Sequence, residues 1–162
     1  MLLLPLFVPV VVMSPVAGRL TARRGPRPAL FAGATLSIAG QLCLLLVTPA
    51  GGYLRLLPTL LGVSFGLGLF TAPLVSTSIR AVPPAQSGLA SGVNNTARQV
   101  GTALGVAIFG ALAGSPAAAP HFVATLRALG VAAAIAWLGV LALIAVGVKA
   151  RPAPSDRFEV AD

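Results

Sequence analysis

Long apolar stretches separated by short polar segments make up most of this 162-residue chain. A membrane core about 30 Å thick needs roughly 20 apolar residues in a helix, and five stretches approach or exceed that length. They are Met1–Ala17, Ala29–Val47, Leu56–Ser78, Ser87–Leu112 and Phe122–Val148. The pattern predicts an all-α integral membrane protein with five transmembrane helices over residues 1–148 and a short tail over residues 149–162.

The first stretch has a second interpretation, because its length and position also suit a cleavable signal peptide. A signal peptide carries basic residues before its apolar part, whereas here the basic residues Arg19, Arg23, Arg24 and Arg27 follow it. Because basic residues hold the adjacent end of a helix in the cytoplasm, we favour a transmembrane helix with its N-terminus outside.

Basic residues in the other connections test this orientation. With the N-terminus outside, the inner segments carry eight of them: Arg19, Arg23, Arg24, Arg27, Arg80, Lys149, Arg151 and Arg157. The outer segments carry only Arg55 and Arg127, and Tyr53 beside Arg55 suits an outer interface. The asymmetry predicts a multi-pass protein of the cell membrane with an outer N-terminus and a cytoplasmic tail.

Composition agrees with a membrane protein and excludes other classes. The chain is 57% hydrophobic and 9% charged, unlike a soluble domain. Its net charge of +8 reflects few acids rather than a dense basic surface, so we do not expect nucleic-acid binding. All three acids lie near the C-terminus, and residues 1–155 contain no carboxylate. Without a carboxylate pair, a nucleophile triad or a metal-ligand cluster, we expect no enzyme activity, no metal and no cofactor.

The fourth stretch carries a polar stripe. At 100° per residue, all its polar side chains except Thr96 project into one sector of about 140°. We predict that this stripe faces a water-filled cavity or another helix bundle, through Ser91, Asn94, Asn95, Arg98, Gln99 and Thr102. Arg98 lies about 16 Å along the helix from Ser87, and a cation at such depth normally avoids lipid. The alternative is that Arg98 snorkels to the cytoplasmic surface.

Small residues and one proline predict how the helices pack. Gly101 and Gly105 form a ladder of small residues at the edge of the polar stripe, and Gly62 and Gly66 form another in the third stretch. Pro73 opposes a straight helix, so the third helix is expected to contain either a static kink or a moving hinge. The second and fifth stretches hold few polar groups and are expected to face lipid.

Two segments resemble the major facilitator superfamily. Residues 18–28, expected to form a cytoplasmic loop, are similar to its loop signature through Gly18, Arg19, Arg23, Gly25 and Arg27. Residues 82–105 resemble the penultimate-helix region of the fourteen-helix drug:proton antiporters of the EmrB/QacA type. The resemblance implies a carboxy-terminal fragment similar to the last five helices of such a transporter. Ala22 stands where the signature usually has Asp, so the ion pair of that acid is not carried over.

The resemblance implies a partial multidrug efflux transporter with an antiporter-like ancestry. Proton antiport needs an acid within the membrane, and residues 1–155 have none, so the chain is expected to be inactive alone. Its expected partners are the lipid bilayer, the missing transporter half or a companion chain, and a hydrophobic small-molecule substrate. The alternative is a small non-transporting scaffold or a regulatory partner of another transporter half.

Overall fold

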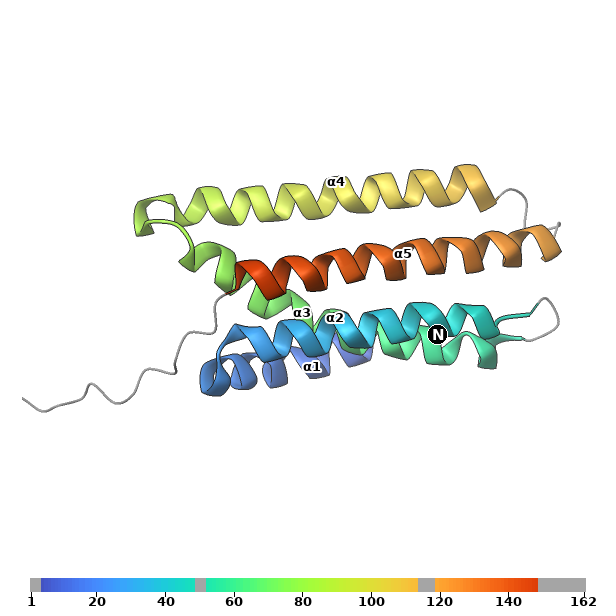
Figure 1. The fold of residues 1–162 in the computed structure, drawn as a ribbon, viewed down its shortest axis with the longest axis horizontal. Helices are drawn as coiled ribbons and strands as arrows, with labels where there is room; N and C mark the ends of the chain where they lie inside the picture. Colours follow the sequence, from blue (N-terminus) through green and yellow to red (C-terminus); the bar gives the residue numbers. More distant parts are fainter. Residues whose placement is uncertain (1–3, 49–51, 114–118, 149–162) are drawn as a thin grey trace, which may run out of the picture.

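The computed structural model describes residues 4–48, 52–113 and 119–148, and these residues are almost entirely helical (Figure 1). The helices are α1 (Leu4–Arg24), α2 (Pro26–Leu42), α3 (Leu57–Arg80), α4 (Ser87–Ala113) and α5 (Ala119–Gly147). Short 3-10 turns cover Cys43–Leu46, Tyr53–Arg55 and Pro84–Gln86. No strand occurs in the described ranges, so the fold is all-α.

Three helical segments are long and apolar enough to cross a membrane: Pro26–Leu46, Tyr53–Arg80 and Pro120–Gly147. α1 and α4 are both at least as long as α2 but are not among them. The fold is that of an all-α membrane protein, and the crossing of the membrane by all five helices stays a prediction.

The connection between α1 and α2 differs from the expected loop over residues 18–28. α1 continues to Arg24 and α2 begins at Pro26, so Gly25 alone separates them. Gly25 has φ of 81°, which glycine adopts at little steric cost, and its N–H donates to the Thr21 carbonyl at 3.0 Å. The expected loop is wrong because the apolar stretch ends before the helix does, and arginine is a good helix former.

One face of the second helix is packed inside the bundle, and its opposite face is exposed, with Leu36 and Leu42 37% and 43% exposed. α2 packs against α1, α3 and α5 (Figure 1). Leu30 and Ala34 form a core with Phe70 of α3 and Ile144 of α5, and the Phe70 ring meets Trp137 edge-on at 4.9 Å. That α2 faces lipid stays a prediction for its exposed face. The packed face was not predicted, because apolar protein neighbours and lipid both need few polar groups on a helix.

Close approach of α2 and α3 explains how the packed face of α2 is covered. A Cβ at Gly62 would lie 2.6 Å from the Cα of Gly40, and a Cβ at Gly66 would lie 2.7 Å from the carbonyl oxygen of Gly33. No real Cβ makes contacts that short, so the two backbones touch only because these positions are glycine. The glycine ladder of the third stretch therefore packs against α2.

Two arginines form hydrogen bonds between α5 and the segment that runs from α2 to Val47, one at each end of that segment. Arg27 donates through Nη2 to the Ala145 carbonyl at 3.3 Å. Arg127 donates through Nε, at 2.9 Å, and through Nη2 to the Val47 carbonyl. Carbonyl groups at the end of a helix lack a partner within that helix, which makes them suitable acceptors. α2 and α5 are thus joined at both ends of the bundle.

Candidate functional site

Helix α4 lies at the edge of the structure, beyond α5 (Figure 1), and most of its surface is unpacked. Among residues 87–112 only Ser87, Ala90 and Asn94 are partly buried, and the rest are exposed. Near the end of α4, Phe109 meets Phe122 of α5 edge-on, with ring centroids 6.0 Å apart. α4 therefore contacts α3 and α5, but most of its surface has no helical neighbour in the described part of the chain.

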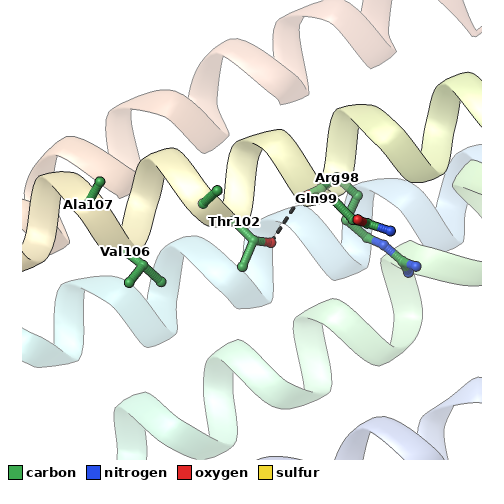
Figure 2. Close-up of a pocket in the computed structure, with 6 residues that line it drawn as sticks. Arg98, Gln99, Thr102, Val106 and Ala107 are labelled. Atoms are coloured by element: carbon green, nitrogen blue, oxygen red, sulfur yellow. Dashed lines mark hydrogen bonds between the residues drawn. The ribbon is translucent and has the colours of Figure 1, made fainter.

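The middle of α4 presents the cation of the polar stripe. Arg98 donates through Nη2 to Oδ1 of Asn95 at 2.9 Å, and Thr102 Oγ1 donates to the Arg98 carbonyl at 2.9 Å (Figure 2). Figure 2 shows Arg98, Gln99 and Thr102 leaving α4 on the same side. A guanidinium has five N–H donors, and no other hydrogen bond joins this one to the described residues. Most of its donors are available to a further partner.

Two open grooves follow the polar stripe. The first, of about 670 Å³, is lined by α4 alone, through Arg98, Gln99, Thr102, Ala103, Val106 and Ala107. The second, of about 470 Å³, lies where α3 ends and α4 begins, and its polar groups are Ser78, Gln86 and Asn94. Asn94 thus lies in a different groove from Arg98, while Ser91 is exposed on α4 and lines neither of them.

The glycine ladder of α4 has no packing partner in the described structure. A Cβ at Gly101 or Gly105 would meet no atom within 4 Å, in contrast to Gly62 and Gly66. A packing role for Gly101 and Gly105 therefore stays a prediction about a neighbour outside the described residues.

Pro73 is buried within α3, which continues through it as one helix. Its carbonyl accepts hydrogen bonds from Ser76 Oγ at 3.0 Å and from Thr77 Oγ1 at 2.7 Å. These are local bonds from hydroxyl groups to the preceding helical turn, and they do not replace the N–H that Pro73 lacks, whose usual acceptor would be the Leu69 carbonyl. Whether α3 bends at Pro73 during a functional cycle stays a prediction.

The loop-signature positions surround the α1–α2 junction without forming one site. Gly18, Arg19 and Arg23 are exposed on the last turns of α1, Gly25 forms the junction, and Arg27 bonds to α5. Sequence reasoning treated Arg127 only as a charge near an outer helix end, whereas its guanidinium bonds to a carbonyl 80 residues away. A backbone acceptor carries no sequence signal, so this role could not be found from the pattern.

Several known proteins are similar in sequence to this chain. Residues 1–106 match the Major Facilitator Superfamily. The chain is 30% identical over 112 residues to the multidrug resistance protein Stp of Mycobacterium tuberculosis, which covers 69% of this chain and 21% of that protein. It is 38% identical over 97 residues to the puromycin resistance protein pur8 of Streptomyces alboniger; the match covers 57% of this chain and 19% of that protein. The cephamycin export protein CmcT of Amycolatopsis lactamdurans is 40% identical over 91 residues; the match covers 55% of this chain and 18% of that protein.

The chain spans about a fifth of the length of these curated relatives. No solved structure matches it significantly.

Proposed function

Since the chain belongs to the Major Facilitator Superfamily, we propose that it is part of an efflux transporter and exports small molecules only together with the remaining helices of such a transporter. The observation that carries the proposal is α4, whose polar stripe is exposed except at its first turns and Asn94, and whose Gly101 and Gly105 have no neighbour in the described structure. Relatives named for multidrug resistance, puromycin resistance and cephamycin export support efflux as the activity of the whole protein.

In this proposal all five helices cross the cell membrane, with the N-terminus outside and the tail in the cytoplasm. α1 has 21 residues and α4 has 27, so both exceed a hydrocarbon core of about 30 Å at 1.5 Å per residue. The C-terminal ends of α1, α3 and α5 lie at the same end of the structure (Figure 1). The exposed Arg19, Arg23, Arg24 and Arg80 lie on the last turns of α1 and α3, which supports a cytoplasmic location for this end.

The stripe of α4 faces the rest of the transporter across a water-filled cavity. An arginine within the membrane costs much less beside water or protein than beside lipid, and Arg98 has donors left for such a partner. Transporters of this kind place the substrate between two helix bundles that rock against each other. A hydrophobic small molecule would therefore be bound between α4 and the missing half.

Proton coupling has to come from outside residues 1–155, because these contain no acid that could gain and lose a proton. The finer part of the proposal is that the five helices correspond to the last five of a fourteen-helix drug:proton antiporter. The resemblance of residues 82–105 supports this part.

A chimaeric transporter tests the proposal. The matching segment of the Mycobacterium tuberculosis relative is replaced by this chain, and energy-dependent dye export is measured in membrane vesicles. We expect export by the chimaera, and none by the relative lacking that segment or by this chain alone. Export by this chain alone, or a folded but inactive chimaera, contradicts the proposal. If the chain instead changes the export rate of an intact transporter, the alternative of a regulatory membrane partner is supported.

A further inference from the structure

The last turns of α1 and α3 bring arginines to the same level of the bundle. α1 and α3 pack together, and a Cβ at Gly68 would lie 2.8 Å from the Cβ of Met13, which sets their register. Arg24 lies about 16 Å beyond Met13, and Arg80 lies about 18 Å beyond Gly68, at 1.5 Å per residue. The two helices therefore end at one level, as Figure 1 also shows.

We define the inner basic end as four arginines on these turns: Arg19, Arg23, Arg24 and Arg80. All four are exposed, and none has a hydrogen bond or ion pair within the described ranges. The other described arginines do have hydrogen-bond partners: Arg27, Arg55, Arg98 and Arg127. Among the described residues, the inner basic end is thus the group of arginines without a partner in this chain.

No carboxylate within the described residues lies beside this group to neutralise it. Residues 1–155 contain no carboxylate, and Ala22 lies among the arginines of α1. A carboxylate within one helical turn would pair with these guanidinium groups and compete with an external anion. The inner basic end is therefore selective for anions that come from outside residues 1–155.

The arginines of α1 are spaced to reach the phosphate level of a membrane. Arg19 and Arg23 share one helix face, and Arg19 lies about 7 Å deeper along the axis than Arg24. The headgroup region on each side of the hydrocarbon core is about as thick as that difference. Guanidinium groups bind phosphate through paired hydrogen bonds, so the group spans the layer in which lipid phosphates lie.

We propose that the inner basic end is a binding site for anionic phospholipids, whose phosphates contact Arg19, Arg23 and Arg24 of α1 and Arg80 of α3. Such lipids bear a net negative charge and attract arginines that flank membrane helices. The site does not depend on transport, because it uses only the α1–α3 edge and requires no substrate or missing half.

The experiment uses the full 162-residue chain in nanodiscs of equal phosphatidylglycerol and phosphatidylcholine, with the lipids that remain bound counted by native mass spectrometry. We expect phosphatidylglycerol to be enriched at least about fivefold, the effect of one or more arginines near an anionic surface. The combined change Arg19→Gln, Arg23→Gln and Arg24→Gln should bring the enrichment close to one. The matched control Arg55→Gln, at the opposite end of the bundle, should leave it unchanged.

Single variants keep the test independent of how well the triple variant folds. Arg24→Gln and Arg80→Gln lie on different helices, and each should lower the enrichment about twofold or more. Inorganic phosphate at millimolar concentration should not displace the lipid. Equal enrichment in the wild type and in these single variants overturns the proposal, and so does displacement by free phosphate, which would indicate a site for the free ion.

Discussion

Arg27 and Arg127 illustrate how single residues are stabilised in a membrane domain without carboxylates. Each donates to a backbone carbonyl near the end of a helical segment, where carbonyl groups lack a partner within the helix. The charge thereby stays close to the membrane surface while the aliphatic part of the side chain covers apolar neighbours. Arginine is suited to this role because its planar group can donate twice to one acceptor.

Arg127→Gln should lower the thermal stability of the chain. Arg127 is partly buried, and hydrogen bonds that involve a charged group contribute about 1.5–3 kcal/mol. The loss would leave the Val47 carbonyl without these bonds, so we expect destabilisation of that order. Thermal unfolding in detergent, followed by Trp137 fluorescence, measures it. The control is Arg55→Gln, whose exposed bond to Thr48 should contribute less than about 0.5 kcal/mol. Equal destabilisation by both changes would contradict the role assigned to Arg127.

Arg98→Ala should impair export in a complete transporter without lowering its expression. Removing a cavity-facing cation takes away a polar contact but relieves a desolvation cost. Loss of one contact to a charged group corresponds to a decrease in export rate of about tenfold or more. Vesicle export in the chimaera measures the effect, and Val100→Ala, on the opposite helix face, is the control. Unchanged export by Arg98→Ala would favour the alternative in which Arg98 snorkels to the surface.

Cysteine accessibility gives the geometric control for the same stripe. With Cys43 replaced by Ser, single cysteines at Asn94, Arg98 and Gln99 should react with a water-soluble thiol reagent in some transport state. A cysteine at Leu104, on the opposite face, should not react. Labelling that does not follow the helical period would contradict the cavity assignment.

At the scale of helices, the sequence predicts where apolar segments lie much better than what surrounds them. Hydropathy located the segments because membrane thickness sets their length. It did not show which face of α2 is packed, since lipid and apolar protein are equivalent on that scale; the close contacts of α2 are made at Gly33 and Gly40. It also ended α1 early, because Arg19 and Arg23 lower hydropathy without breaking a helix. The polar stripe could be predicted because helical periodicity fixes which side chains share a face.

Gly66→Ala and Gly101→Ala should separate the two glycine ladders. In the 162-residue chain, an added methyl at Gly66 meets the backbone of Gly33 and Ser37, so we expect destabilisation by about 1–3 kcal/mol. The same change at Gly101 meets nothing within 4 Å and should be neutral or slightly stabilising, because alanine favours helix. Thermal unfolding of both variants measures this difference.

The complete transporter should reverse the result at Gly101. There a larger change, Gly101→Leu, should lower both stability and export, because a large side chain pushes helices apart. A complete transporter that tolerates Gly101→Leu would show that this ladder has no packing partner.

For the whole molecule, the main contrast is between a packed bundle and a helix with an uncovered polar side. α2, α3 and α5 share a hydrophobic core and α1 packs against α2 and α3, whereas α4 exposes Leu89, Val93 and Leu104 as well as its stripe. Lipid can cover the apolar side of α4 but not Arg98 and its polar neighbours. The stripe must therefore be covered by water or by other protein, which is the physical reason for proposing that the chain functions as part of a larger assembly.

The orientation of the whole chain can be tested with three reporters. Fusions after Val47 and after Lys149 should report opposite sides of the membrane, outside and inside respectively, as the distribution of basic residues predicts. A reporter inserted at Gly25 should agree with the one after Lys149, because the Arg27–Ala145 hydrogen bond holds the start of α2 beside the end of α5. If Val47 and Lys149 report the same side, the topology of five crossings is wrong. If instead Gly25 and Lys149 report opposite sides, the packing of α2 against α5 cannot exist in the membrane.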